Sequence, residues 1–253
     1  MPPTEPATDL RERFRGARQD PAQVVLEGLH ALKHALRFGA AIELIVTPDR
    51  RALLALAAEL APDLATALAE GALELPADRF AELAPHPPRT GVLALARRPG
   101  VDAAALLMAP GEAPVVLLQQ PSDLGNIGAA IRVAAAAGAA GLVTTGRHDP
   151  WHPAAVRGAA GLHFALPVGC IDRLPPTPRP LVALHGAGEP IDGQDLPAGA
   201  ILAFGSERSG LDAELLARAD RIVAIPMRPG ISSLNLATAV AVALYAWIRR
   251  PGA

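Results

Sequence analysis

The stretch "SDLGNIGAAIRVAAAAGAAGLVTTG", residues 122–146, places one arginine in the middle of an apolar helix pattern. That arginine, Arg132, stands among Ala, Ile, Val and Gly, and a helix that is apolar on all sides is expected to be buried. A guanidinium keeps its charge in a protein, so burying it without a partner is very costly. The pattern therefore predicts that Arg132 either reaches solvent along its stem or meets something anionic.

The segments on either side of this helix indicate a parallel sheet. "PVVLLQQ" (114–120) is a continuous apolar run, typical of a strand buried on both faces, and "GLVTTG" (141–146) is a second strand. Strand, helix and strand together predict a βαβ unit. A helix followed by a short strand is expected over 153–170. Further strands are expected at 180–186, 200–205 and 221–227, with a final helix over 235–249. We predict an α/β domain with a mostly parallel sheet over 114–253.

The first half of the chain predicts a smaller domain. From residue 21 short strands and amphipathic helices alternate up to 98, which indicates an α/β domain over 21–98. Residues 1–20 are rich in Pro, Arg and acidic residues and predict a mobile arm. Residues 99–113 contain two Pro-Gly breaks and predict a linker.

Composition narrows the function classes. The net charge of −2 argues against a protein that coats nucleic acid non-specifically. Cys170 is the only cysteine, which excludes an intramolecular disulfide and a multi-cysteine zinc site. The N-terminus lacks a signal-peptide pattern, and the longest apolar run is too short to span a bilayer comfortably. We expect a soluble, cytoplasmic protein with no membrane partner. We also expect no metal, because the pairs His30/His34 and His148/His152 are more typical of solvated surface than of a metal site.

Three loops at the ends of predicted strands carry the polar groups that chemistry needs. They are "SDLGNIGAAIR" (122–132), "FGSERSGL" (204–211) and "IPMRPGISSLN" (225–235). Open α/β folds bind ligands where such loops meet. Each loop has a local explanation, since Asn and Gly form turns and Ser caps helices. Together they place an Arg, a Glu, a Ser and two Asn at one edge of a sheet, which predicts a site.

A dinucleotide site is the alternative ligand class. Asp149 lies near the spacing expected for a ribose-binding acid after the first glycine loop. However, "GNIG" is not G-x-G-x-x-G, and Ile131 fills the position of the third glycine. A nicotinamide-dependent oxidoreductase therefore stays open as an alternative.

In order and spacing, the three loops resemble the motifs of the SpoU/TrmH family, the RNA 2′-O-methyltransferases of the SPOUT superfamily. The resemblance covers 114–250, and 21–98 is similar to the family's ribosomal-protein-like substrate-binding domain through "VVLEGLHALKHAL" and "RTGVLALARR". It implies a C-terminal trefoil knot, S-adenosylmethionine as methyl donor, and a homodimer whose interface completes the site. It also implies an RNA substrate, ribosomal RNA rather than tRNA, because a minimal tRNA enzyme of the family would not need 21–98.

The resemblance also assigns site residues by motif position. The residues expected to hold the cofactor, largely through backbone atoms, are Gly205, Ile225 and Leu234. The expected catalytic and RNA-contacting set is Asn126, Arg132, Glu207, Ser233 and Asn235. The sequence departs from the family pattern at Ser232, where an acidic residue is common, and at Leu236, which replaces a common Val. Neither departure removes a reacting group.

The chemistry of methyl transfer suggests a role for Arg132. The 2′-hydroxyl must lose a proton, and an arginine with a pKa above about 12 is a poor acceptor. We expect Arg132 to clamp the target phosphate and stabilise the developing alkoxide, with Glu207 orienting Arg132 or a nearby donor. The phosphate, a water or a partner side chain could take the proton. A tRNA 2′-O-methyltransferase and a catalytically silent RNA-binding module of the same fold remain alternatives.

Overall fold

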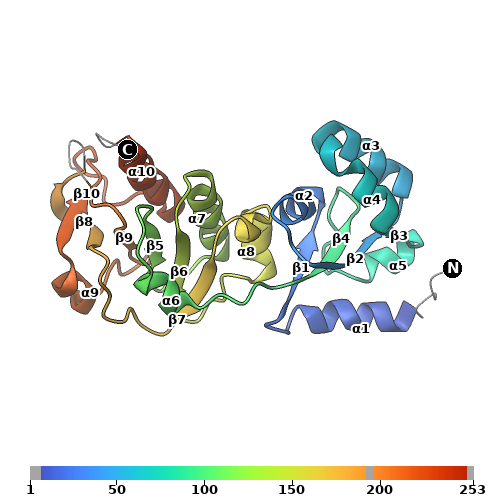
Figure 1. Ribbon diagram of the computed structural model, residues 1–253, viewed down its shortest axis with the longest axis horizontal. Helices are drawn as coiled ribbons and strands as arrows, with labels where there is room; N and C mark the ends of the chain where they lie inside the picture. Colours follow the sequence, from blue (N-terminus) through green and yellow to red (C-terminus); the bar gives the residue numbers. More distant parts are fainter. Residues whose placement is uncertain (1–6, 192–195, 250–253) are drawn as a thin grey trace. The chain divides into compact units, whose positions relative to one another are not determined.

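A computed structural model of the chain describes residues 7–191 and 196–249 and divides into two compact units. Unit 1 comprises Met1–Gly100 and Trp151–Phe164, and unit 2 comprises Val101–Pro150 and Ala165–Ala253. Figure 1 labels the helices and strands of both units. Each unit has its own sheet and its own buried core.

The elements of unit 1 are α1 (Ala7–Ala17), β1 (Gln23–Glu27), α2 (Leu29–Arg37), β2 (Ile42–Thr47), α3 (Arg50–Leu60), η1 (Pro62–Leu64), α4 (Ala65–Gly71), β3 (Ala72–Glu74), α5 (Ala77–Ala81), β4 (Leu93–Arg97), α8 (Pro153–Gly158) and η2 (Leu162–Phe164). The elements of unit 2 are α6 (Ala103–Met108), β5 (Val115–Leu118), α7 (Leu124–Ala136), β6 (Gly141–Thr145), β7 (Val168–Ile171), β8 (Leu181–Pro190), β9 (Ile201–Phe204), α9 (Ala213–Arg218), β10 (Arg221–Ala224) and α10 (Leu236–Ile248).

The sheet of unit 2 has six strands in the order β10-β8-β9-β5-β6-β7, and each neighbouring pair is parallel. This confirms the predicted mostly parallel α/β sheet and its six expected strands, including β7 within 153–170. Helices α7 and α10 lie on one face, and α6 and α9 lie on the other (Figure 1). Val115 and Leu117 of β5 face the core under α6 and α9. The knot that the resemblance implies stays a prediction.

The sheet of unit 1 has four strands in the order β1-β4-β2-β3. Strand β4 pairs antiparallel with β1 and β2, and β3 runs parallel to β2. The predicted strands and helices between 21 and 98 are confirmed, including the helix that ends before Gly39, which has a φ of 73°. A positive φ is the left-handed conformation in which glycine commonly ends a helix.

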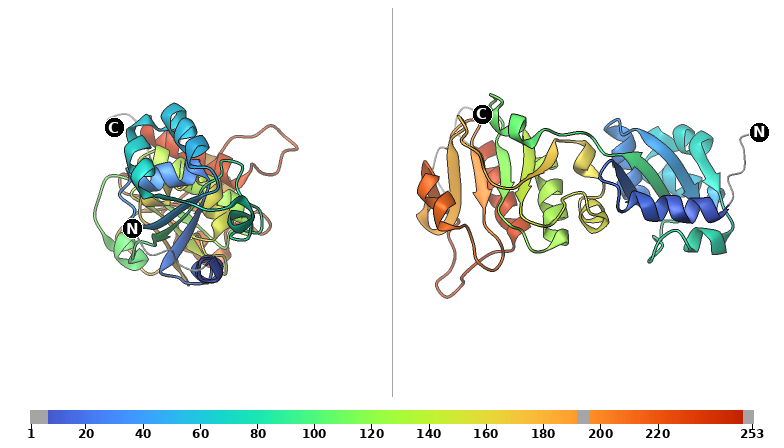
Figure 2. Two further views of the ribbon diagram at one scale, coloured as in Figure 1. Left: turned by 90° about the vertical axis from the view of Figure 1, so that its right-hand side faces the viewer. Right: turned by 90° about the horizontal axis from the view of Figure 1, so that it is seen from below.

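Helix α1 corrects the predicted mobile arm. In "LRERFRGAR" (10–18), the apolar residues Leu10, Phe14 and Ala17 recur among charged residues at the spacing of one helix face and are buried. They pack in the core of unit 1 with Val25 of β1 and Leu95 of β4. Figure 2 shows α1 beside the unit 1 sheet. The arm prediction is therefore wrong for residues 7–17, and residues 1–6 lie outside the described part of the chain.

Helix α6 corrects the predicted linker over 99–113. Asp102 caps this helix by accepting a hydrogen bond from the backbone N–H of Ala105 at 2.9 Å. Ala103 and Leu107 are buried in the core of unit 2. The two Pro-Gly pairs therefore lie on either side of a packed helix, and the segment belongs to unit 2 from Val101 onward.

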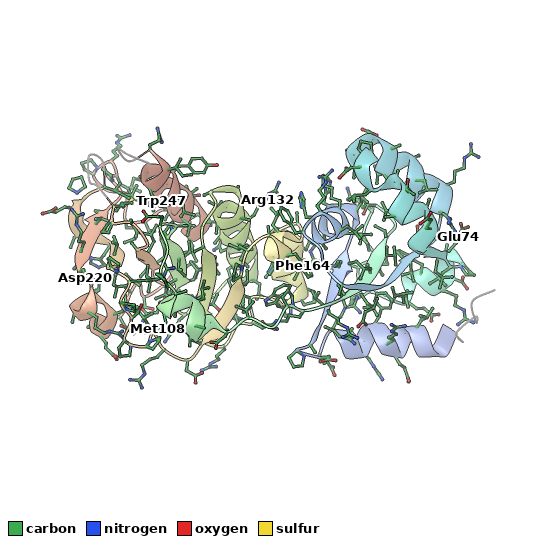
Figure 3. The ribbon with its side chains drawn as sticks, viewed as in Figure 1. Glu74, Met108, Arg132, Phe164, Asp220 and Trp247 are labelled. Carbon is green, nitrogen blue, oxygen red and sulfur yellow. The ribbon has the colours of Figure 1, made fainter. Side chains whose placement is uncertain are left out.

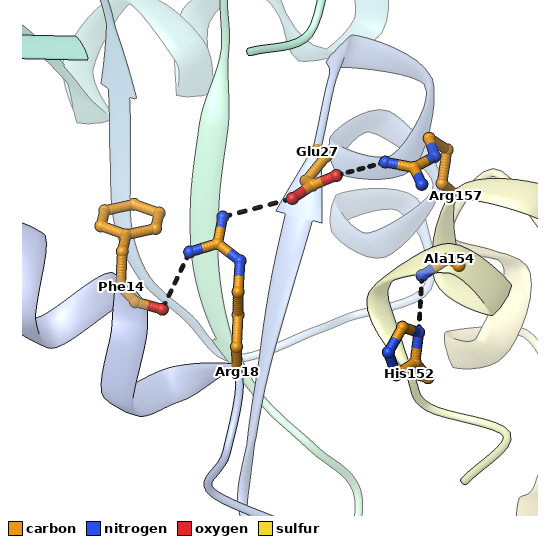
Figure 4. Close-up of polar contacts among 6 residues, drawn as sticks. All are labelled: Phe14, Arg18, Glu27, His152, Ala154 and Arg157. Atoms are coloured by element: carbon orange, nitrogen blue, oxygen red, sulfur yellow. Dashed lines mark hydrogen bonds and ion pairs between the residues drawn. The ribbon is translucent and has the colours of Figure 1, made fainter. Parts of the chain in front are cut away.

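The connection between β6 and β7 corrects the predicted boundary of the second domain, because Trp151–Phe164 packs in unit 1. Figure 4 shows the ion pairs that hold this segment. The buried carboxylate of Glu27 accepts from Arg18 at 3.2 Å and from Arg157 of α8 at 2.6 Å. Arg18 also donates to the carbonyl of Phe14, so one carboxylate connects β1 to the end of α1 and to α8.

Close backbone packing completes the attachment of this segment. Gly161 has a φ of 75°, and a Cβ there would lie 2.3 Å from the carbonyl oxygen of Ala31, so only glycine fits. The guanidinium of Arg98 stacks over the Trp151 ring at 5.3 Å, a cation–π contact. Residues from between two strands of the unit 2 sheet thus form part of the unit 1 fold.

Arg179 is a buried cation that fastens two loops of unit 2. It is 6% exposed and donates from Nε to Ala109, and from Nη1 to Ala113 and Gly199, all to backbone oxygens at 2.7–3.1 Å. These carbonyls belong to the segments just before β5 and β9, the two central strands. Arg179 therefore fixes the entry of both strands into the sheet.

Replacing Arg179 with methionine is expected to lower the free energy of unfolding by about 2–4 kcal/mol, because hydrogen bonds from a charged donor to buried carbonyls are lost. Denaturant unfolding measures this change. The matched control is Arg173→Met, at a side chain that is 78% exposed, where we expect a change within about 0.5 kcal/mol. Equal effects of the two substitutions would contradict the role given to Arg179.

Every helix in the described residues is too short or too polar to cross a membrane. The same residues contain no group of three or more His, Cys, Asp or Glu side chains placed to hold a metal ion.

Candidate functional site

A cavity of about 790 Å³ lies in unit 2 at the ends of β9 and β10 and beside the middle of β8. The second predicted loop, after β9, and the third, after β10, form much of its wall. Its apolar lining includes Leu184, Phe204, Leu211 and Ile225. A concave site of this volume that combines apolar walls with polar groups suits a small-molecule ligand.

Glu207 connects the first loop to the second. Its Oε1 accepts from Asn126 Nδ2 at 2.8 Å, and its Oε2 accepts from the backbone N–H and the hydroxyl of Ser122 at 2.9 and 2.8 Å. Asn126 Oδ1 in turn accepts from Asn235 Nδ2 at 2.7 Å. The three loops are therefore joined by one chain of hydrogen bonds running from Ser122 through Glu207 and Asn126 to Asn235.

Which group donates and which accepts along this chain of hydrogen bonds follows from the chemistry of the side chains. An ionised carboxylate only accepts hydrogen bonds, so the amide nitrogen of Asn126 must face Glu207 and its oxygen must face Asn235. Asn235 then turns its own oxygen to the N-terminus of α10, where it accepts from the N–H groups of Ala237 and Thr238. The chain of hydrogen bonds is therefore fixed at one end by the charge of Glu207 and at the other by Asn235, which caps α10.

The electrostatics of Glu207 follow from the same contacts. Burial opposes its ionisation, but the hydrogen bonds from Asn126 and Ser122 outweigh burial and lower the pKa of Glu207 to about 2. A carboxylate with this pKa is a very weak base at neutral pH. Glu207 is thus suited to hold donors in position and not to accept a proton from a substrate.

The depressed pKa predicts the pH dependence of this network. Because the pKa of Glu207 is lower in the folded chain than the ordinary value of 4.5, its ionisation stabilises the fold above about pH 4.5. That contribution is lost as the pH falls toward 2. In a carboxyl ¹³C NMR titration, we expect the Glu207 signal to stay constant from pH 8 to pH 4.5. A midpoint above pH 4 would contradict the hydrogen-bond network.

Close packing fixes the loop that carries Glu207. A Cβ on Gly205 would lie 2.0 Å from the carbonyl carbon of Gly210, so no other residue fits there. Ser206 and Gly210 exchange two backbone hydrogen bonds of 3.1 and 3.0 Å, which close the loop on itself. The loop is therefore a fixed turn with Glu207 near its tip.

The residues predicted to hold the cofactor, Gly205, Ile225 and Leu234, all line the cavity. Ser233, Asn235 and Glu207 of the expected catalytic set line it as well. Asn126 is joined to it through Glu207 and Asn235. The structure thus brings together seven of the eight predicted residues, although their roles stay predictions.

Arg132 is the exception: within its own chain, Glu207 orients nearby donors, which was the other expected arrangement, and not Arg132. Both oxygens of Glu207 accept from Ser122 and Asn126, and Arg132 is exposed. Figure 3 shows Arg132 projecting from α7 away from the strands. Helix α7 is not buried on all sides, since Gly125, Arg132 and Ala136 form an exposed row. Arg132 therefore needs no partner within its own chain.

Two parts of the site were not predicted. The long strand β8 bulges between its two pairings with β10, and the bulge places His185, Gly186 and Ala187 in the cavity wall. Glycine inside a strand pattern, as in "HGAGEP" (185–190), is the signal that could have indicated a bulge. The other is Ser122, the first residue of the first loop, to which the sequence pattern gave no role.

Comparison with protein families gives one match to this region. The model of the SpoU rRNA Methylase family matches residues 113–245, slightly more than half of the chain.

Two curated relatives illustrate the sequence similarity. A 23S rRNA (uridine(2479)-2′-O)-methyltransferase of Streptomyces viridochromogenes is 35% identical over 150 residues, which is 53% of this chain and 52% of the relative. The 23S rRNA (guanosine-2′-O-)-methyltransferase RlmB of Acinetobacter baylyi is 31% identical over 183 residues, 66% of this chain and 74% of the relative. The chain matches about half the length of several such relatives.

Solved structures extend the similarity over both units. The SpoU methyltransferase AviRb from Streptomyces viridochromogenes, crystallised with AdoMet, is 25% identical, with a TM-score of 0.77 and 98% of each chain covered. An AdoMet-bound rRNA methyltransferase from Sinorhizobium meliloti is 25% identical, with a TM-score of 0.73 and coverage of 96% of this chain and 94% of that one.

Proposed function

The chain belongs to the SpoU rRNA Methylase family, and on that premise we propose that it transfers a methyl group from S-adenosylmethionine to a ribose 2′-hydroxyl of ribosomal RNA. The observation that carries this proposal is the cavity whose wall is tied by hydrogen bonds through Glu207, Asn126 and Asn235. Similarity to two AdoMet-bound structures and to 23S rRNA methyltransferases supports the cofactor and the substrate class.

The cavity residues fit the proposed cofactor. Gly205 lines the cavity with backbone atoms only, because a Cβ there would clash with Gly210, and the apolar side chains of Phe204 and Ile225 suit an adenosine group. Backbone atoms of Gly205, Ile225 and Leu234 would hold the cofactor. When bound, S-adenosylmethionine supplies a methyl group on a positively charged sulfur.

The protein's own contribution is positioning. Glu207 holds Ser122 and the amide of Asn126 in one orientation, and Asn126 orients Asn235. Polar groups fixed in this way at the cavity can place a ribose hydroxyl without reorganising during the reaction. Because the pKa of Glu207 is about 2, the proton of the hydroxyl goes to another group, such as the RNA phosphate or a water.

Unit 1 is proposed to bind the RNA. Its exposed arginines Arg51, Arg79 and Arg89 form no ion pair within the described residues and are available to phosphates. Substrate selection by a dedicated unit favours ribosomal RNA over tRNA, in line with the names of the relatives.

A homodimer is the proposed assembly. Val242, Tyr245 and Ile248 of α10 form an exposed apolar row, and α10 packs beside α7, which exposes Arg132. Ile231 and Leu234, on the loop between β10 and α10, are also exposed, and Figure 2 shows this loop projecting from its unit. Several exposed apolar residues on one helix and on the loop before it are typical of a protein interface. A second copy would cover it and bring its own Arg132 to the contact.

Methyl transfer from labelled S-adenosylmethionine to an unmodified 23S rRNA transcript tests the proposal, with the modified ribose mapped by its resistance to alkaline hydrolysis. Labelling of tRNA instead would show a tRNA enzyme. Binding of S-adenosylmethionine without transfer to either RNA would indicate a silent RNA-binding module. In calorimetry, binding of NAD but not S-adenosylmethionine would overturn the proposal in favour of an oxidoreductase.

A further inference from the structure

We propose that Arg208 binds a phosphate of the RNA strand at the mouth of the cavity and so fixes the register of the target nucleotide. This inference rests on the proposed function and adds a substrate-binding residue to it. Among the described residues that line the cavity, Arg208 is the only one with a permanent positive charge.

Arg208 has no anionic partner in the described chain. Its sequence neighbour Glu207 is the nearest carboxylate along the chain, but both Glu207 oxygens already accept from Ser122 and Asn126. Arg208 is exposed and takes part in no ion pair or hydrogen bond of its side chain within the described residues. Its charge is therefore available to an incoming anion.

The support of Arg208 is fixed before any ligand arrives. Ser206 Oγ lies 2.6 Å from Ser209 Oγ and accepts from the N–H of Ser209 at 3.1 Å. The backbone hydrogen bonds between Ser206 and Gly210 close the same turn. A side chain that emerges from a fixed turn loses less conformational freedom on binding than one on a mobile loop.

The chemistry of the cavity favours a phosphate over the carboxylate of the cofactor. Arg208 is exposed, whereas Gly205 and Ile225, two of the three proposed cofactor residues, are partly buried. A planar guanidinium matches a phosphate with two parallel hydrogen bonds. Phosphate contacts of this kind set orientation and register rather than base specificity.

The test compares Arg208→Gln, Arg208→Lys and Arg173→Gln with the wild-type chain. Arg173 is an exposed arginine of the same unit that does not line the cavity, so it is the matched control. For Arg208→Gln we expect the KM for a 23S rRNA transcript to rise about tenfold or more. The salt dependence of RNA binding should fall by about 0.7 in log–log slope. The Kd for S-adenosylmethionine should stay within about twofold. The KM of Arg208→Lys for RNA should lie between the values of the wild type and Arg208→Gln, because lysine keeps the charge and loses the planar fork.

Every other outcome of the test contradicts either the inference about Arg208 or the proposed function. A weaker Kd for S-adenosylmethionine with an unchanged KM for RNA would show that Arg208 binds the cofactor carboxylate and would overturn the inference. Equal KM values for Arg208→Gln, Arg173→Gln and wild type would show a solvated arginine and overturn it too. If the wild-type chain transfers no methyl group to any RNA, the proposed function fails first, so the two failures are distinguishable.

Discussion

Replacing Glu207 with glutamine is expected to lower kcat about 100-fold or more while S-adenosylmethionine binds with nearly unchanged affinity. The carboxylate accepts three hydrogen bonds, from Asn126 and twice from Ser122. Glutamine has one acceptor oxygen and one NH₂ donor, so its NH₂ end must face a donor, either Asn126 or Ser122. If that end faces Asn126, the Asn126 amide must flip, and its nitrogen then faces the nitrogen of Asn235.

Asn235 cannot follow this flip without cost, because its oxygen caps α10. The substitution thus disorders polar groups on all three loops while leaving the apolar cavity walls intact.

Single-turnover methyl transfer measures the rate, and calorimetry measures cofactor binding. The control is Glu214→Gln, an exposed carboxylate outside the cavity, for which we expect wild-type values. A Glu207→Gln variant with wild-type kcat would show that the hydrogen-bond chain has no part in the reaction.

The meeting of the three loops at one site could be predicted from the sequence because each loop follows a strand of one parallel sheet. The carboxyl ends of β9 and β10 open at the same edge as that of β5, so the loops that follow them had to lie close together. The apolar runs of four to seven residues identified these strands, and Asp212 and Asn235 each precede a helix that they cap. Local patterns of this kind survive in any tertiary context.

The parts that sequence reasoning missed depend on contacts distant along the chain. Nothing in the pattern of α8 shows that it packs on β1, because the attachment rests on Arg157 meeting Glu27 more than a hundred residues away. The burial of α1 also depends on a partner surface, since a stripe of Leu10, Phe14 and Ala17 within charged residues is weak evidence alone. The cavity wall from β8 required the register shift against β10.

The position of Arg132, by contrast, could have been predicted from helix geometry. Arg132 follows Asn126 by six residues on α7, which turns it about 240° around the axis and moves it about 9 Å along it. Asn126 faces Glu207, so Arg132 must face elsewhere. If Arg132 takes part in the reaction, it does so at the cavity of a second copy.

Replacing Arg132 with alanine is expected to lower methyl transfer more than about 1,000-fold, because it removes the clamp proposed for the target phosphate. Cofactor binding should survive, since Arg132 does not line the cavity of its own chain. Arg132→Lys should also fail, because an ammonium lacks the planar fork. Turnover by Arg132→Ala at the wild-type rate would remove this residue from the mechanism.

Mixing two inactive variants shows from which subunit Arg132 acts. In a dimer of Arg132→Ala with Glu207→Gln, one cavity has an intact Glu207 and faces the intact Arg132 of the other subunit, whereas the second cavity has neither. If the site is shared, unfolding and refolding the two variants together should restore a substantial fraction of activity from two nearly inactive proteins. If Arg132 serves its own subunit, every cavity lacks one of the two residues and the mixture stays inactive. A different affinity tag on each variant, with purification through both tags, isolates the mixed dimer, and light scattering checks its size. Activity in the mixture can come only from a cavity assembled by two chains, so its absence in a confirmed dimer would place Arg132 outside the shared site.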